Sequence, residues 1–368
     1  MRSQLALMVW LGLSLSPASA KDLHIAVAVP ITGSNAYGGE QIRRGAEAAS
    51  DVINSQGGVE GRRIALSLHD DACDPKQAVL VAHRIVAAGI TLVDGHFCSG
   101  ASIPASEIYA EGGVLMMTPG SLNSKLTDNA LQKGWPTIMR LFVRDDVQGK
   151  LMGQWLAKRY AGKRIAFIHD KTAFGKNLAD HVKEEMNTSG LAEVIYDGIN
   201  PGEKDYTSVV SRLKSLRVDA VYFGGYPQEA GLILRQAADQ KIHFDFVANS
   251  SFMTSEFWSI TGPAGEGVLF PFPADPRALP SAKQAVERMR AAGQDPEGFT
   301  LFSYAVIQAL AEGTKRAKSD DGKAIAAALR SAPVETVLGP ITFDAKGDAQ
   351  GIEFAIYRWH NGNYERLD

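Results

Sequence analysis

The sequence has few cysteines and no excess of charge of either sign. Its 368 residues include 2 Cys, and 38 Lys and Arg against 41 Asp and Glu give a net charge of −3. It contains no Lys/Arg stripe and no interleaved run of aromatic and basic residues, which argues against a nucleic-acid partner. After residue 20 no stretch is long and apolar enough to cross a bilayer, so we expect no membrane insertion.

The chain also lacks the short motifs of common enzyme classes. It has no G-x-S-x-G, H-E-x-x-H, P-loop or G-x-G-x-x-G sequence. Its histidines are scattered, without the spacing of metal ligands, and the acidic segment 70–74 lacks the ligand rhythm of a calcium loop. We therefore expect no cofactor, no metal and no catalysis, although a catalytic triad need not form a local motif.

The first 20 residues have the pattern of a secretory signal peptide. Arg2 supplies a positive charge, residues 5–15 form an almost unbroken apolar run, and Ala18-Ser19-Ala20 is a small-residue cleavage site. The apolar run is too short to span a bilayer, and no cysteine follows the site to take a lipid anchor. We expect cleavage after Ala20 and export of the mature chain, with a retained anchor as the alternative.

Export affects the interpretation of the two cysteines, Cys73 and Cys98. In an oxidising compartment an isolated pair is most simply a disulfide. Closing a loop of about 25 residues would contribute roughly 3 kcal/mol in the loop-entropy model. Two free thiols or a shared metal are the alternatives, and no His/Cys spacing supports the metal.

Short β-like runs alternate with helical stretches in two successive series. The first has strands at 24–29, 63–68, 91–95 and 114–117 and helices at 41–54, 75–88 and 103–109; the second has strands at 165–168, 192–196, 218–223 and 244–248 and helices at 174–187, 206–216 and 228–240. This alternation predicts an α/β fold with parallel, doubly wound sheets in two similar lobes.

The other predicted elements connect or complete these series. Between them lies a helix at 145–160, with Val147, Leu151, Trp155 and Leu156 on one face. The Pro-rich segment 271–280 has the composition of a crossing segment. Three further helices, at 281–292, 299–317 and 322–330, and strand-like runs at 337–339, 341–343 and 353–359 complete the lobes.

The stretch from residue 90 to 123 is the most informative one. It predicts strand, turn, helix, strand and a second turn, so both turns lie at the carboxyl ends of parallel strands. Open α/β sheets bind ligands at that edge. Ser99 opens the helix, where a hydroxyl and free N–H groups favour an anion; a plain capping serine is the alternative.

A set of short motifs, in order along the mature chain, carries a resemblance to a known family. They are 70–78 (DDACDPKQA), 95–99 (GHFCS), 104–109 (PASEIY), 165–171 (IAFIHDK), 198–205 (GINPGEKD), 224–226 (GGY) and 339–342 (GPIT). They closely resemble segments of the leucine/isoleucine/valine-binding proteins of bacterial ABC importers.

The resemblance implies a type I periplasmic binding protein. Its two Rossmann-like lobes would be joined by three crossovers and would close on a ligand in the cleft between them. The N-terminal lobe would comprise 21–144 and 274–352, and the C-terminal lobe 145–273 and 353–368. The resemblance also implies that Cys73 pairs with Cys98.

It implies a set of ligand contacts as well. Ser99 would bind the ligand carboxylate through its hydroxyl and N–H, and the turn Gly120-Ser121-Leu122 would offer main-chain groups. Tyr226 and Phe174 would face them from the second lobe, and Tyr37 or Gly38 would line the wall near the side-chain pocket. Phe174 and Tyr37 could instead be packing residues, and Tyr226 a strand-end residue with its hydroxyl in water.

Two positions depart from the amino-acid binders of the family. Leu122 stands where those proteins have a threonine, and Ser250 where a glutamate pairs the ligand ammonium. A buried ammonium without an anionic partner is costly. We therefore expect a hydrophobic or aromatic carboxylic acid without an α-ammonium, held between Leu122 and the aromatic residues Tyr37, Phe174, Tyr226, Phe252 and Phe299.

Some neighbouring residues leave alternatives open. Glu229 or Glu256 could replace the lost acid, which would make the protein a true branched-chain amino-acid binder with a rearranged ammonium site. Arg144 could add a second anion contact, although we expect it to be solvent-exposed. The predicted function is that of a monomeric periplasmic subunit that delivers its small-molecule carboxylate to a membrane permease; a ligand sensor with a signalling partner is the rival.

Overall fold

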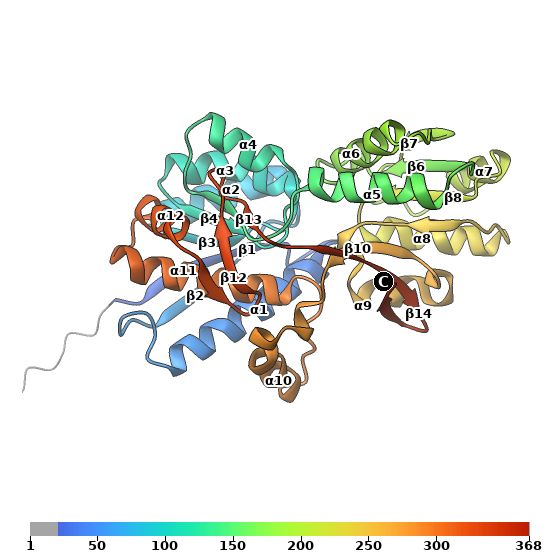
Figure 1. The fold of residues 1–368 in the computed structure, drawn as a ribbon. Helices are drawn as coiled ribbons and strands as arrows, with labels where there is room; N and C mark the ends of the chain where they lie inside the picture. The colour runs from blue at the N-terminus through green and yellow to red at the C-terminus, as the bar shows by residue number, and fades with distance from the viewer. Residues whose placement is uncertain (1–20, 368) are drawn as a thin grey trace, which may run out of the picture.

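The computed structural model describes residues 21–367, so the predicted signal peptide lies outside the described residues. Figure 1 shows two lobes side by side, with helices α1–α4, α11 and α12 in the first and α5–α9 in the second. None of the helices in residues 21–367 combines the length and the apolar character needed to cross a bilayer.

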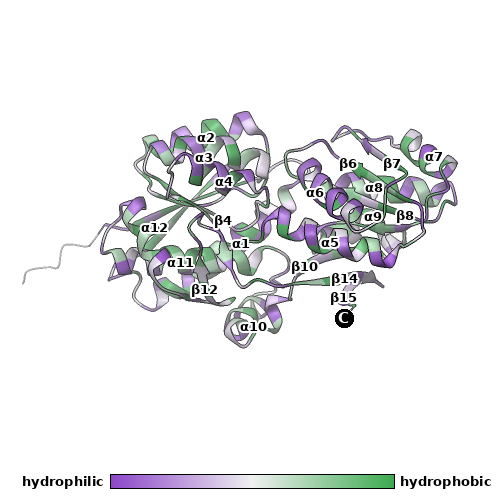
Figure 2. Cartoon of the chain, turned by 45° about the horizontal axis from the view of Figure 1, so that its top comes forward, coloured by the Kyte–Doolittle hydropathy of each residue, from purple (hydrophilic) through white to green (hydrophobic). Residues whose placement is uncertain are grey.

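The first lobe is built on a five-stranded parallel sheet in the order β2-β1-β3-β4-β5. Its strands are β1 (Leu23–Val29), β2 (Ile64–Asp70), β3 (Leu92–Gly95), β4 (Leu115–Thr118) and β5 (Ile138–Arg140). Its helices are α1 (Ala36–Ser55), α2 (Pro75–Ala87), α3 (Ser99–Glu111), α4 (Lys125–Gln132), α11 (Thr300–Ala317) and α12 (Gly322–Ser331). β3, β4 and β5 are buried at every residue, as expected for parallel strands covered on both faces, and Figure 2 colours the strands of this lobe as largely hydrophobic.

The second lobe is built on a seven-stranded sheet in the order β15-β14-β10-β9-β8-β6-β7. Its strands are β6 (Ile165–His169), β7 (Ile195–Gly198), β8 (Ala220–Gly224), β9 (Asp245–Val247), β10 (Leu269–Pro273), β14 (Phe354–His360) and β15 (Asn363–Arg366). Its helices are α5 (Asp145–Arg159), α6 (Gly175–Thr188), α7 (Thr207–Ser215), α8 (Pro227–Asp239) and α9 (Ser255–Thr261). β14 runs antiparallel to both of its neighbours, β10 and β15, and the other strand pairs of this described sheet are parallel.

The chain passes between the lobes three times. The crossovers lie between β5 and α5, between β10 and α10 (Lys283–Ala291), and between β13 and β14. A small antiparallel sheet of β11 (Val334–Thr336), β12 (Gly339–Phe343) and β13 (Ala349–Gln350) precedes the third crossover. The predicted α/β architecture of two lobes and three crossovers is therefore confirmed.

The predicted apolar face of the helix at 145–160 is wrong in part. On α5, Val147 is 49% and Leu151 is 36% exposed, whereas Leu156 is buried. The helix packs on α6 through Gly149 and Gly153, where an added Cβ would lie 2.5 Å from the Cβ of His181 and of Glu185 respectively. Close approach of the two backbones, rather than the larger apolar side chains, determines which face is buried.

Other differences come from pairing between distant segments. The Pro-rich stretch predicted to be a crossing segment begins inside β10, which pairs with β9 and with β14 from the end of the chain. α4 and β5 were not predicted, and residues 337–338, predicted as strand, lie between β11 and β12. α1 begins at Ala36, five residues before the predicted helix start at residue 41.

Candidate ligand-binding cleft

The first turn of α3 presents hydrogen-bond donors around Ser99. The helix follows Cys98, which is extended, and Ser99 is buried at 1% exposure. The Ser99 hydroxyl oxygen accepts the Asn123 N–H at 3.2 Å, which leaves its own proton free to donate. No hydrogen bond within residues 21–367 engages the N–H of Ser99 or Gly100. These groups suit a carboxylate at the positive end of the helix.

The turn after β4 faces this helix start. The Gly120 and Ser121 N–H groups donate to the Thr118 hydroxyl at 3.2 and 2.9 Å, so both are already used. The Leu122 N–H, by contrast, meets no acceptor in the described chain. Leu122 is therefore the member of the predicted Gly120-Ser121-Leu122 turn whose N–H is available to a ligand.

The loop that carries Ser99 is fixed from behind by a disulfide and a buried polar network. Cys73 and Cys98 form a disulfide with their Cα atoms 5.4 Å apart, the pairing that the resemblance implies. Asp71 accepts from the Cys73 N–H at 2.8 Å and lies 2.5 Å from His96 Nδ1, whose Nε2 lies 3.0 Å from the Tyr109 hydroxyl. Burial raises the pKa of Tyr109 above its usual value, so its hydroxyl keeps its proton at neutral pH.

A cluster of aromatic rings joins the two lobes at the cleft. Its members are Tyr37, Phe97, Phe174, Tyr226 and Phe299. The Phe97 ring lies 6.0 Å from Tyr37, 5.0 Å from Phe299 and 6.3 Å from Tyr226, and Phe174 lies 5.0 Å from Tyr226. The structure thus brings together four of the five predicted aromatic wall residues.

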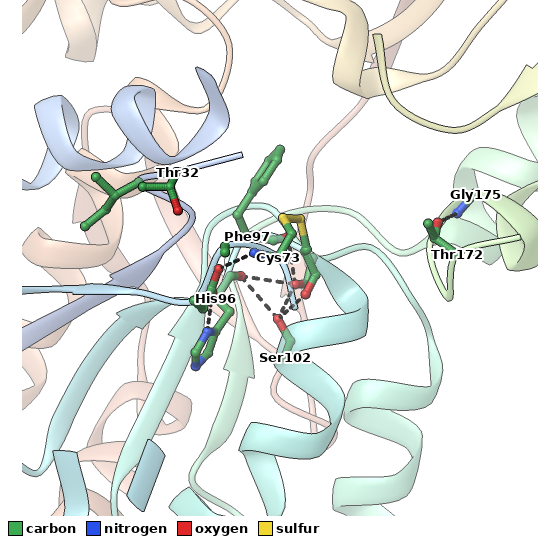
Figure 3. Close-up of a disulfide and its surroundings, with 12 residues drawn as sticks. Thr32, Cys73, His96, Phe97, Ser102, Thr172 and Gly175 are labelled. Atoms are coloured by element: carbon green, nitrogen blue, oxygen red, sulfur yellow. Dashed lines mark hydrogen bonds and ion pairs between the residues drawn. A yellow bond between two sulfur atoms is a disulfide. The ribbon is translucent and has the colours of Figure 1, made fainter. Parts of the chain in front are cut away.

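Phe97 is the member that sequence reasoning missed. Its ring fits between two glycines, because an added Cβ would lie 2.4 Å from it at Gly38 and 2.7 Å at Gly120. In Figure 3 the ring projects from the loop in the direction opposite to the His96 side chain. The available signal was its position directly before Cys98 and Ser99, two residues with predicted roles.

The expected wall residue Phe252 is placed elsewhere. It is fully buried, with its ring 5.0 Å from that of Phe257, and its carbonyl accepts from the Trp359 indole at 3.2 Å. It belongs to the core of the second lobe. Phe299 is 2% exposed and connects the cleft to this interior, because its ring also contacts Phe142 at 5.1 Å.

A cavity of about 250 Å³ lies between the lobes. It is lined by Ser34, Asn35, Ala72, Cys73, Asp74, Cys98 and Gly100 from the first lobe and by Thr172, Pro201, Tyr226 and Glu229 from the second. Side-chain atoms without a hydrogen-bond partner in residues 21–367 occur here and nearby: Asn35 Oδ1, the Tyr37 hydroxyl, Asp170 Oδ2 and the Ser250 hydroxyl. Buried polar atoms are normally paired, so these atoms are candidates for ligand contacts.

Ser250 itself is completely buried, in a short 3₁₀ turn with Ser251 and Phe252. Its surroundings supply no carboxylate on the same turn. Glu229, 3% exposed, accepts the Gly202 N–H at 3.1 Å and lines the cavity, whereas Glu256 is exposed. Burial raises the pKa of Asp170 to about 6, with Glu229 contributing to the shift.

Arg144 is neither solvent-exposed nor free for a ligand. Its side chain is 12% exposed, and the guanidinium pairs with Asp128, Asp146 and Asp348 at 2.8–3.0 Å. Its charge is therefore neutralised inside the protein, which corrects the prediction of an exposed arginine.

A group of three or more potential metal ligands does not occur in residues 21–367.

The turn after β4 makes a direct hydrogen bond to the second lobe. The Asn123 side-chain amide donates to the Ala173 carbonyl at 2.6 Å, and Asn123 also donates its N–H to Ser99. The turn that faces the carboxylate subsite is thus also a contact between the lobes.

Comparison with known proteins gives a consistent result. The profile described as periplasmic binding protein matches residues 22–363. Leu/Ile/Val-binding protein homolog 1 of Brucella suis is 43% identical over 342 residues, covering 93% of this chain and 91% of that protein. A leucine binding protein from Thermotoga maritima superposes with a TM-score of 0.85 at 25% identity, covering 94% and 98% of the two chains. A solute binding protein from R. palustris, solved with benzoate, superposes with a TM-score of 0.83 at 22% identity, covering 94% and 95%.

Proposed function

Since the chain belongs to the Leu/Ile/Val-binding group of periplasmic binding proteins, the substrate-binding proteins of ABC transporters, we propose that its ligand is a small hydrophobic or aromatic carboxylic acid without an α-ammonium. The family consists of solute-binding proteins rather than enzymes, so the chemistry to explain is recognition. Binding would bring the two lobes together around the ligand.

The observation that carries this proposal is the polarity of the two lobes. On the first lobe, the Ser99 hydroxyl, the N–H groups of Ser99 and Gly100, and the Leu122 N–H offer donors to a carboxylate. On the second lobe, Ser250 is buried and uncharged, with its hydroxyl unpaired within residues 21–367. An ammonium placed against Ser250 would lose its hydration without gaining an anion, at a cost of several kcal/mol.

The walls favour an apolar or aromatic body. Phe97, Tyr37, Phe174, Tyr226 and Phe299 surround the space with rings whose centres lie 5.0–6.3 Å from their neighbours, a spacing typical of favourable aromatic pairs. The R. palustris relative in fold was solved with benzoate, an acid of this class.

A branched-chain amino acid is the second candidate, and a specific observation favours it. Glu229 lines the cavity and Asp170 Oδ2 has no partner in the described chain. Either carboxylate could pair an ammonium that enters from a different direction than in other family members. The Thermotoga maritima relative in fold is named a leucine binding protein.

The proposed physiological role follows from the family. We assign residues 21–144 with 274–352 to the N-terminal lobe and 145–273 with 353–368 to the C-terminal lobe. The mature chain, after removal of the signal peptide at Ala20, would act as a monomer in the periplasm and dock on a membrane permease in its closed form. A sensor that docks on a signalling protein is the rival, and transport assays in a permease deletion strain separate the two.

A thermal-shift screen tests the ligand class. One panel holds leucine, isoleucine, valine and phenylalanine, and the other holds benzoate, phenylacetate, cinnamate and short branched keto acids. A ligand at about 1,000 times its Kd stabilises the folded state by about 4 kcal/mol. We expect the second panel to raise Tm and the first to have no effect.

A Ser250→Glu variant sharpens the test, with Ser259→Glu, at an exposed position of α9, as the control for added charge. If Ser250 excludes an ammonium, only the Ser250→Glu variant should gain affinity for leucine and lose affinity for the acids. Stabilisation of the wild-type protein by leucine would refute the proposed ligand class and support the second candidate.

A further inference from the structure

A buried arginine lies directly behind the turn that faces the carboxylate subsite. Arg140 ends β5 and is 0% exposed. Its Nη1 donates to the carbonyl oxygens of Ser121 and Asn123 at 3.0 and 3.1 Å, its Nη2 to the Thr127 hydroxyl at 2.6 Å, and its Nε to Asp348 at 2.8 Å. One planar guanidinium therefore holds two carbonyls of the turn in fixed directions.

The direction of those carbonyls determines the direction of the neighbouring N–H groups. In a trans peptide unit the C=O and the following N–H point in opposite directions. The Ser121 carbonyl points at Arg140, so the Leu122 N–H points away from Arg140. The adjacent Asn123 N–H donates to Ser99, which places this side of the turn next to the start of α3. The Leu122 N–H is thus turned toward the subsite at Ser99, and no acceptor in the described chain engages it.

We propose that Arg140 is a positioning residue for ligand recognition, which keeps the Leu122 N–H aimed at the ligand carboxylate. The inference rests on the proposed function only in that the ligand has a carboxylate. One oxygen of the carboxylate would accept hydrogen bonds from Ser99, and the other oxygen would accept one from the Leu122 N–H. Arg140 never touches the ligand, and its contribution is the orientation and polarisation of the peptide unit between them.

The chain offers a matched control in Arg144. Arg144 shares two partners with Arg140, because it also donates to the Thr127 hydroxyl, at 3.2 Å, and to Asp348, at 3.0 Å. Of the two arginines, only Arg140 donates to carbonyls of the turn. Arg140→Lys and Arg144→Lys therefore each disturb an ion pair with the buried Asp348, but only the first removes the contacts to the turn.

The test compares an acid with its amide in each variant. The probes are benzoate against benzamide and leucine against leucinamide, and Kd is measured by titration calorimetry. Arg140→Lys should weaken the binding acid by tenfold to a hundredfold, as for one hydrogen bond to a charged group, and should weaken the amide much less. Arg144→Lys should leave the ratio of acid to amide affinity unchanged.

A second measurement needs no variant. In the wild-type protein labelled with ¹⁵N, the amide proton of Leu122 should shift downfield when the acid binds. A Leu122 amide that does not move on binding, or an Arg140→Lys variant that loses acid and amide affinity equally, would overturn the inference. Failure of benzoate and leucine alike to bind the wild-type protein is a different result, because it would overturn the proposed function and remove the carboxylate subsite with it.

Discussion

The carboxyl group of Asp94 should make the unfolding free energy of this protein depend on pH. Asp94 lies in β3, is fully buried, and has Oδ2 2.6 Å from the Ser303 hydroxyl, which in turn lies 2.8 Å from the Ile42 carbonyl. A serine hydroxyl has one proton and cannot donate to both oxygens. Both contacts are hydrogen bonds only when Asp94 carries a proton that it donates to Ser303. Burial accordingly raises the pKa of Asp94 well above its usual value.

The magnitude follows from linkage between proton binding and folding. The unfolded chain releases the Asp94 proton above about pH 3.9, whereas the folded chain retains it. The unfolding free energy therefore falls by about 1.4 kcal/mol for each pH unit between the unfolded and the folded pKa. The contribution is complete below the unfolded pKa and is lost as pH rises through the folded pKa.

Urea unfolding of the wild-type protein and of Asp94→Asn measures this slope. The asparagine has the same shape, donates to Ser303 at every pH, and has no proton to lose. At pH values between the unfolded pKa, about 3.9, and the raised folded pKa, the wild-type protein should lose about 1.4 kcal/mol per pH unit relative to the variant. Asp51→Asn, at an exposed position of α1, controls for the loss of a carboxylate. Parallel pH profiles for the wild-type protein and Asp94→Asn would refute the reasoning.

Two further predictions concern the cleft loop. Ser99→Ala should weaken binding of a carboxylate ligand at least about tenfold in titration calorimetry, because a hydrogen bond to a charged group contributes about 1.5–3 kcal/mol; an unchanged Kd would remove Ser99 from the subsite. Replacing Cys73 and Cys98 together by alanine should lower the unfolding free energy by about 3 kcal/mol in chemical denaturation, the loop-entropy value for their separation of 25 residues. Equal stability would show that the network of Asp71, His96 and Tyr109 holds the loop without the disulfide.

The fold was largely predictable because its central strands are continuous apolar runs. β6 and β8, for example, are buried at every residue, so their sequences carry a clear signal. β10 was missed since its two prolines indicate a break, whereas its place in the sheet depends on β14, which lies about 85 residues later in the chain, within reach only after folding. The buried face of α5 was misjudged because glycines, which carry no hydropathy signal, determine its contact with α6.

The candidate site was predictable to the extent that motifs mark it. Ser99, Tyr226 and the turn at Gly120 lie at strand ends, where the order of elements alone places them on one edge. Phe97 and Arg140 were missed for a common reason. The importance of Phe97 depends on two distant glycines, and that of Arg140 on carbonyl groups that every residue possesses. A pattern of residue types does not show which backbone carbonyl groups will accept a hydrogen bond or which glycines will make room for a ring.

The hydrogen bond from Asn123 to Ala173 across the cleft contributes to the affinity of the protein for its ligands but not to its selectivity among them. A contact between the lobes adds the same free energy to closure around every ligand. Substitutions at Asn123 would therefore multiply all dissociation constants by a common factor and leave their ratios unchanged. Evolution could in this way adjust the affinity to the abundance of a nutrient without altering the residues that choose it.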